Sequence, residues 1–197
     1  MVKTLGSSDS EIAGIMVHGR GASAQSILGL SKQIKNKNIY YIAPQAETRE
    51  WYPNSFLNPI EDNQPQLDNA LETVEECIEK LVDKGFNTED IFLLGFSQGA
   101  CLVTEYATRN PGKFKAVIGL SGGLIGPKGT EFNYDGDLAE TPIFLGCSEN
   151  DPHIPKNRVD ETEKVLRELN GDVEKRIYPG AAHGIIEDEV QWINKHI

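Results

Sequence analysis

Cysteine and positive charge are both scarce in this chain, and each shortage disfavours a class of protein. The three cysteines are Cys77, Cys101 and Cys147, with no CxxC pair. An odd number cannot pair fully within one chain, which argues against a disulfide framework. Nineteen basic residues stand against thirty acidic ones, and the net charge of −11 disfavours binding to nucleic acid or to an anionic membrane.

Long apolar runs are also missing. No apolar stretch reaches about 18 residues, and no basic segment followed by an apolar run opens the chain. The sequence therefore predicts neither a membrane span nor a secretory signal. Together with the cysteines, this predicts a cytoplasmic protein with reduced thiols. A length of 197 residues suits a single domain, residues 1–197. The sequence carries no indication of oligomeric state.

Short apolar runs alternate instead with longer amphipathic segments. This alternation predicts an α/β fold, with a mostly parallel sheet covered by helices on both faces. The expected strands are Ile12–Val17, Ile39–Ala43, Ile91–Leu94, Val117–Leu120, Ile143–Cys147 and Val173–Tyr178. The expected helices are Ser23–Ile34, Leu67–Val82, Gln98–Thr108, Thr162–Leu169 and Glu187–His196. Gln45–Pro65 is expected to be a long irregular loop, and too few residues separate Ser121 from Thr141 for a helical cap domain.

The segment Gly95-Phe96-Ser97-Gln98-Gly99 matches the pattern G-x-S-x-G. It follows an expected strand and precedes an expected helix, the context in which a tight turn exposes a nucleophilic serine. The first N–H groups of that helix would face developing negative charge. The pattern predicts Ser97 as a nucleophile. The alternative is a glycine-rich turn that only joins a strand to a helix.

A serine hydroxyl needs a base to take its proton. The chain order serine, acid, histidine favours His183, which lies between the last expected strand and the closing helix. His153 is the rival, and we expect it to line the site instead. The acid is expected after Ile143–Cys147, where Asp151 and Glu149 both qualify. Asp151 is favoured because the prolines after it fix the loop; alternatively, it only caps that turn.

The glycine-rich segment His18–Gly21 follows the first expected strand. It predicts one half of an oxyanion hole, formed by the backbone N–H groups of Arg20 and Gln98. Backbone donors suffice for this role, so the Arg20 side chain is free for another. A phosphate-binding loop is a weak alternative, because neither the G-x-G-x-x-G spacing nor a Gly-Lys-Ser/Thr ending is present.

Three aromatic residues in the long loop, Trp51, Tyr52 and Phe56, are candidates for substrate binding. They are expected either to form an apolar wall for an acyl or aryl group or to anchor the loop to the core. The side chains of Arg20 and Arg49 are expected either to meet a polar or anionic group or to extend into solvent.

Four segments resemble those of the phospholipase/carboxylesterase family of α/β-hydrolases, which includes bacterial carboxylesterases and acyl-protein thioesterases. The segments are His18–Gly21, Gly95–Ala100, Asp151–Pro155 and Gly180–Gly184, and the similarity runs from about Ile12 to the C-terminus. The resemblance implies an α/β-hydrolase fold without a cap domain. It also implies nucleophile Ser97, acid Asp151, base His183 and oxyanion N–H groups from Arg20 and Gln98.

Two positions depart from the family pattern. Arg20 stands where members usually carry an aliphatic or small residue, and Ala22 stands where many carry Asp. Substrate preference is therefore not carried over.

The expected activity is hydrolysis of a carboxylic ester, with a short acyl or an aryl group, through an acyl-enzyme. Thioesterase or lysophospholipase activity with the same groups remains open. A non-catalytic ligand-binding protein on a hydrolase scaffold is the alternative of another class. The expected partner is a small-molecule ester or thioester, and no nucleic acid, metal or cofactor is expected.

Overall fold

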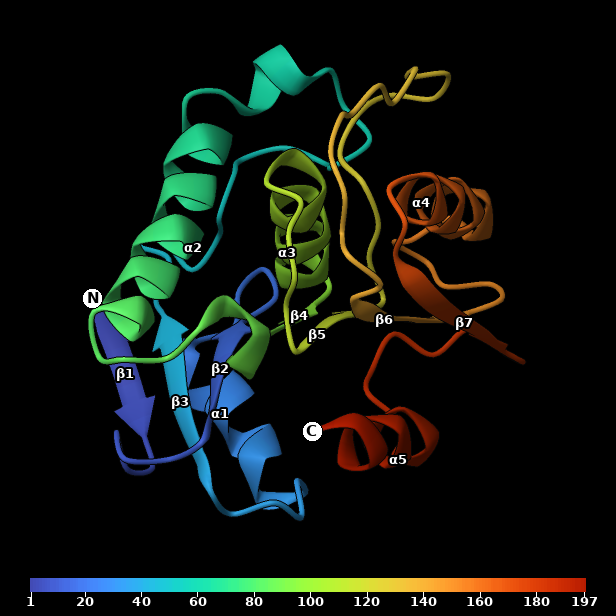
Figure 1. Ribbon diagram of the computed structural model, residues 1–197. Coiled ribbons are helices and arrows are strands. Elements are labelled where there is room, and N and C mark those ends of the chain that lie inside the picture. The colour runs from blue at the N-terminus through green and yellow to red at the C-terminus, as the bar shows by residue number, and fades with distance from the viewer.

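A computed structural model describes residues 1–197 and contains one seven-stranded sheet (Figure 1). The strand order is β1-β3-β2-β4-β5-β6-β7. Every neighbouring pair is parallel except β1 and β3, which are antiparallel. The strands are β1 Val2–Leu5, β2 Ile12–Val17, β3 Ile39–Pro44, β4 Ile91–Phe96, β5 Ala116–Leu120, β6 Pro142–Ser148 and β7 Asp172–Tyr178.

Five α-helices cover the sheet on both faces. They are α1 Ala24–Leu28, α2 Gln66–Val82, α3 Gln98–Arg109, α4 Lys156–Glu168 and α5 Glu187–His196. Short 3-10 turns occur at Gly29–Lys32, Ile60–Asn63 and Thr88–Asp90. Helices α2, α3 and α4 lie on one face, and α1 and α5 lie on the other (Figure 1). None of the helices combines the length and apolarity needed to cross a membrane.

Each face of the sheet buries its own hydrophobic core. In β4, Leu93 belongs to a cluster of 38 buried residues that includes α2, α3 and α4, whereas Leu94 belongs to a cluster of 18 that includes α1 and α5. Successive side chains of a strand point to opposite faces. The central strands are therefore apolar at every position, which explains why they were recognisable as short continuous runs.

The observed architecture confirms the predicted α/β-hydrolase fold without a cap domain. All six predicted strands are present, but β1 was missed because its side chains are exposed and form no apolar pattern. The predicted helix Ser23–Ile34 is wrong in its second half. Helix α1 ends at Leu28, and Gly29, a poor helix former, begins a tighter 3-10 turn. Helix α4 begins at Lys156, well before the predicted Thr162, directly after the proline at 155.

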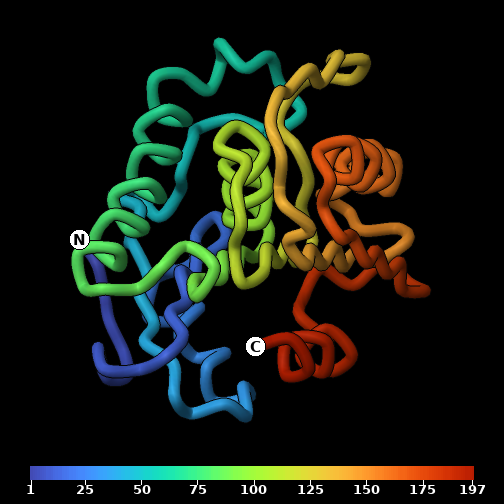
Figure 2. Tube along the Cα trace, viewed as in Figure 1, coloured from blue at the N-terminus to red at the C-terminus, as the bar shows by residue number.

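The connection between β5 and β6 is irregular and extends past α3 beside the loop after β3 (Figure 2). Buried Glu105 of α3 holds it by accepting hydrogen bonds from the Ile125 N–H at 3.0 Å and the Tyr134 hydroxyl at 2.9 Å. The Gly126 N–H donates to the Phe56 carbonyl at 2.8 Å. These bonds join two irregular segments above the same face of the sheet.

Glu189 of α5 is a buried carboxyl group that makes stability depend on pH. It is 1% exposed, and its Oε2 accepts a hydrogen bond from the Ile186 N–H at 2.9 Å. Burial raises the pKa of Glu189 from 4.5 to about 7. Because the folded state binds this proton more tightly than the unfolded state, folding becomes less favourable as pH rises through that interval.

We predict that Glu189→Gln removes this pH dependence, since the amide keeps an oxygen acceptor for the Ile186 N–H and does not ionise. The free energy of unfolding of the wild type should fall by about 2 kcal/mol between pH 5 and pH 8 relative to the variant. Urea denaturation at both pH values measures this difference. Glu187→Gln, on the exposed side of the same helix, is the matched control and should behave like the wild type. Parallel curves for wild type and Glu189→Gln would contradict the prediction.

Candidate active site

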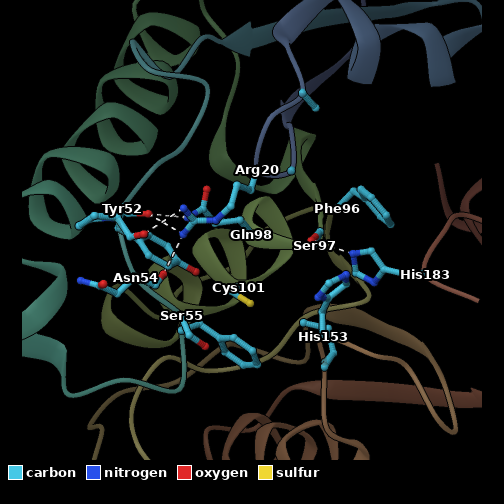
Figure 3. A pocket seen from close by; sticks show the side chains of 15 residues that line it. Arg20, Tyr52, Asn54, Ser55, Phe96, Ser97, Gln98, Cys101, His153 and His183 are labelled. Atoms are coloured by element: carbon cyan, nitrogen blue, oxygen red, sulfur yellow. Dashed lines mark hydrogen bonds between the residues drawn. The ribbon is translucent and has the colours of Figure 1, made fainter. Parts of the chain in front are cut away.

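Three polar side chains from distant parts of the chain meet at the carboxyl edge of the sheet. Ser97 directly follows β4, Asp151 follows β6, and His183 follows β7. The Nε2 atom of His183 lies 2.9 Å from the Ser97 Oγ (Figure 3). Its Nδ1 lies 2.8 Å from the Asp151 Oδ2. The three side chains therefore form one continuous hydrogen-bonded chain.

Ser97 occupies a sharp turn between β4 and α3, with φ 56° and ψ −120°. A non-glycine residue in the left-handed region is strained, and such strain persists only where the surroundings enforce it. Here the surroundings are glycines: a Cβ at Gly95 would lie 2.1 Å from the Gly99 carbonyl oxygen, and a Cβ at Gly99 would lie 2.2 Å from the Val17 carbonyl oxygen. The spacing G-x-S-x-G is thus a steric requirement of this turn.

The Asp151 side chain is fully buried. Its Oδ1 accepts hydrogen bonds from the backbone N–H groups of His153 at 2.9 Å and Ile154 at 3.1 Å. Burial is the largest influence and would raise the pKa of Asp151, but the hydrogen bonds from His183 and the two amides together outweigh it and lower the pKa. The carboxylate is therefore ionised at neutral pH. Glu149, the other sequence candidate, is exposed.

Two hydrogen bonds to backbone carbonyls of the loop after β7 position His183. The Asn150 N–H donates to the Gly180 carbonyl at 3.0 Å, and the Ser148 hydroxyl donates to the Ala182 carbonyl at 2.6 Å. The Phe96 ring packs against the His183 ring with centroids 5.1 Å apart. His183 is therefore held from its own loop, from the loop that carries Asp151, and from the residue before Ser97.

His153 lies at the mouth of the site, as expected for a residue that lines it. Its ring packs edge-on against the His183 ring, with centroids 4.8 Å apart and planes at 73°. Figure 3 shows His183 next to Ser97, with His153 alongside. The Ser97 hydroxyl is hydrogen-bonded to His183 and not to His153.

Buried His18 orients the segment predicted to supply oxyanion contacts. Its Nδ1 lies 2.8 Å from the Gly19 carbonyl oxygen, and its Nε2 accepts a hydrogen bond from the Ala46 N–H at 3.2 Å. Since the Ala46 N–H can only donate and the Gly19 carbonyl can only accept, the His18 ring carries its proton on Nδ1. In a trans peptide the C=O and N–H point in opposite directions. Holding the Gly19 carbonyl therefore also orients the Arg20 N–H.

Sequence reasoning did not assign a role to His18. The available signal was its place directly before the glycine-rich turn. Burial lowers the pKa of His18 below 6.5, although the bond to the Gly19 carbonyl acts in the opposite direction. The neutral ring required by its two hydrogen bonds is therefore the favoured form near pH 7.

The second predicted oxyanion donor is the Gln98 N–H. It is the first N–H of helix α3 and has no intrahelical acceptor.

A cavity of about 520 Å³ lies beside Ser97. Both His153 and His183 line this cavity. The further lining residues are Gly19, Arg20, Ala22, Tyr52, Pro53, Asn54, Ser55, Phe56, Phe96, Gln98, Cys101 and Ile154. Tyr52 and Phe56 are 1% and 6% exposed and also belong to the hydrophobic core. These two aromatic residues therefore both anchor the loop and face the cavity.

Trp51 does not line this cavity, which corrects the expectation of a wall formed by all three aromatic residues. Its Nε1 donates a hydrogen bond to the His18 carbonyl at 2.8 Å, and the Trp51 ring packs on the His18 ring with centroids 4.9 Å apart. Trp51 thus fixes the loop against the end of β2. The consecutive side chains of Trp51 and Tyr52 therefore point in different directions, that of Trp51 toward His18 and that of Tyr52 toward the cavity.

The sequence model of the Phospholipase/Carboxylesterase family matches residues 7–197. The chain belongs to this family. A phospholipase/carboxylesterase from Dyadobacter fermentans DSM 18053 is 41% identical, with a TM-score of 0.95 over 98% of this chain and 94% of that one.

Curated relatives of this chain include an acyl-protein thioesterase and a carboxylesterase. Acyl-protein thioesterase 1 of Saccharomyces cerevisiae is 30% identical over 72% of this chain, and Carboxylesterase SOBER1 of Arabidopsis thaliana is 22% identical over 93% of it. The chain spans 62% of the length of the yeast thioesterase and 88% of the length of SOBER1. It therefore spans less than two thirds of the thioesterase.

We predict that Asp151→Asn leaves the site intact but holds His183 in the wrong tautomer. The two backbone N–H groups at Oδ1 will select the amide oxygen of the new side chain, so its NH2 group will face the His183 Nδ1. That nitrogen must then accept, and Nε2, which faces Ser97, must carry the proton. The kcat for ester hydrolysis should fall by about 10³–10⁴-fold.

The steady-state rate on a p-nitrophenyl ester measures this loss, and nitrogen-15 chemical shifts of the imidazole report the tautomer. Asp135→Asn, on an exposed loop, is the matched control and should keep the wild-type rate. An Asp151→Asn variant with an unchanged tautomer and a kcat near that of the wild type would refute the assignment.

Proposed function

We propose that this protein is a serine hydrolase of carboxylic esters, folded as one domain over residues 1–197. The observation that supports this most strongly is the hydrogen-bonded chain from Asp151 through His183 to Ser97, beside a cavity and at the first turn of α3. Membership of the phospholipase/carboxylesterase family supports the same conclusion.

In the proposed first step, the Ser97 Oγ attacks the acyl carbon of the substrate while the His183 Nε2 takes its proton. Asp151 keeps the His183 proton on Nδ1 and stabilises the imidazolium that forms. The carboxylate can do this because it is ionised and held by two backbone N–H groups.

The negative charge that develops on the acyl oxygen needs donors already in place. We assign these to the backbone N–H groups of Arg20 and Gln98. Collapse of the tetrahedral intermediate breaks the ester bond, and the alcohol leaves with the proton from His183. Water, deprotonated by the same imidazole, then hydrolyses the acyl-enzyme and restores the Ser97 hydroxyl.

The proposed substrate carries a short acyl or an aryl group. Tyr52, Phe56, Phe96 and Ile154 give the cavity an apolar lining suited to such a group. All three cysteines are free and buried, which supports a reducing compartment such as the cytoplasm.

Thioester hydrolysis is a second candidate, since curated relatives are named acyl-protein thioesterase 1. The same groups serve both reactions, because only the leaving atom differs. Matched pairs of esters and thioesters that share one acyl group separate the two. A higher kcat/KM for the thioester across the pairs would favour the second candidate.

We predict that Ser97→Ala lowers kcat by about 10⁴-fold or more on a p-nitrophenyl ester, because the nucleophilic oxygen is lost. A fluorophosphonate probe should label the wild type at Ser97, as located by peptide mass spectrometry, and should not label the variant. Ser55→Ala, which removes another hydroxyl from the cavity lining, controls for loss of any nearby serine in the labelling experiment. A wild-type protein that binds esters but is neither labelled nor active would be a non-catalytic binding protein, and the proposal would fail.

A further inference from the structure

The proposed mechanism uses only the backbone N–H of Arg20 and leaves its side chain unexplained. The guanidinium donates hydrogen bonds to three consecutive backbone carbonyls, those of Tyr52 at 2.8 Å, Pro53 at 3.0 Å and Asn54 at 2.7 Å. It also forms an ion pair with Glu50. Figure 3 shows Arg20 between Ser97 and this segment, with the bonds to Tyr52 and Asn54 dashed.

These contacts engage four of the five N–H donors of the Arg20 side chain and leave only the Nε–H for any other group. Of its five N–H donors, the two on Nη1 face Glu50 and the Pro53 carbonyl, and the two on Nη2 face the Tyr52 and Asn54 carbonyls. The Glu50 carboxylate offsets the positive charge of the Arg20 guanidinium. The Arg20 side chain is 40% exposed, in line with the expected solvent exposure, but its Nη1 and Nη2 groups are bound within the protein.

The segment that Arg20 holds is one wall of the cavity. Tyr52, Pro53, Asn54, Ser55 and Phe56 all line it consecutively. In Figure 3 the labelled residues of this wall lie on the side of the cavity opposite Phe96 and His183. We call residues 52–56 the cavity wall. Its distance from Ser97 sets the space available to an acyl group.

Gln98 holds the same wall at its beginning. Its side-chain Oε1 accepts a hydrogen bond from the Trp51 N–H at 2.9 Å, and its Nε2 donates to the Tyr52 carbonyl at 2.8 Å. Both residues proposed to supply oxyanion N–H groups thus use their side chains to hold one wall. The wall is tied directly to the groups that face the reacting carbonyl.

Arginine is the side chain that suits this arrangement. Three carbonyl oxygens that converge on one point repel each other unless donors separate them. The planar guanidinium offers donors in a fixed fork, whereas the ammonium group of lysine is a compact point charge with three donors. An unbranched apolar side chain of similar length offers none, and the carbonyls would then turn to water and displace the wall.

We propose that the Arg20 side chain determines the acyl-chain selectivity of this enzyme by holding the cavity wall at a fixed distance from Ser97. This inference rests on the proposed function. A rigid wall accepts an acyl group of one size range and rejects longer ones. Release of the wall admits longer acyl groups and reduces the discrimination between lengths.

The test compares Arg20→Met and Arg20→Lys with the wild type on p-nitrophenyl esters from acetate to decanoate. In Arg20→Met the ratio of kcat/KM for decanoate to that for butyrate should rise about 10-fold or more. Arg20→Lys, which keeps the charge but has fewer donors, should give an intermediate ratio. Arg49→Met removes an arginine from the loop that carries the cavity wall. Arg49 itself does not line the cavity, and the ratio for this variant should match the wild type.

Two outcomes separate failure of this inference from failure of the proposed function. If fluorophosphonate does not label wild-type Ser97, the proposed function fails. If the wild type is labelled and active but Arg20→Met and Arg20→Lys lose kcat/KM equally at every chain length, the function stands and the selectivity role is overturned. Should Arg20→Met not fold, as judged by circular dichroism, the ratio measured for Arg20→Lys decides the question.

Discussion

The start of helix α3 lies so close to the end of strand β2 that no side chain fits between them. A Cβ at Gly99 would lie 2.2 Å from the Val17 carbonyl oxygen and 2.7 Å from that of His18. This approach forces the sharp turn at Ser97. It also places the first N–H of α3 beside the loop that leaves β2. The serine hydroxyl and both proposed oxyanion donors therefore derive their positions from one contact between two backbones.

The remaining parts of the site are built outward from that contact by buried polar groups. His18 fixes the Gly19 carbonyl, and Trp51 in turn binds the His18 carbonyl. On the other side, the Asp151 Oδ1 accepts two hydrogen bonds from backbone N–H groups of its own loop. The side chains of His18, Trp51 and Asp151 are thus each bonded to groups other than Ser97. The reacting centre is thus surrounded by groups that have little freedom to reorganise during a reaction.

The sequence predicted those features that depend on local pattern. Apolar runs identified the buried strands, and motif spacing identified Ser97, Asp151 and His183 as partners at the carboxyl edge. Strand β1 was missed because an exposed edge strand has no apolar signature. The role of Arg20 was missed for a different reason: its acceptors are backbone carbonyls, which every residue carries. Trp51 and Phe56 were indistinguishable in sequence, and only the path of the loop separates an anchor from a lining residue.

The double use of residue 20 has a consequence for the evolution of such enzymes. Its peptide N–H is available whatever its side chain, while its guanidinium contacts the cavity wall and Glu50. Under the proposed roles, a substitution at this one position alters which substrates are accepted and leaves the proposed catalytic groups unchanged. Position 98 tolerates fewer substitutions, because the Gln98 side chain both accepts a hydrogen bond from the Trp51 N–H and donates one to the Tyr52 carbonyl. Under the same proposal, position 20 is therefore the place where this scaffold can change its acyl preference without altering the oxyanion donors.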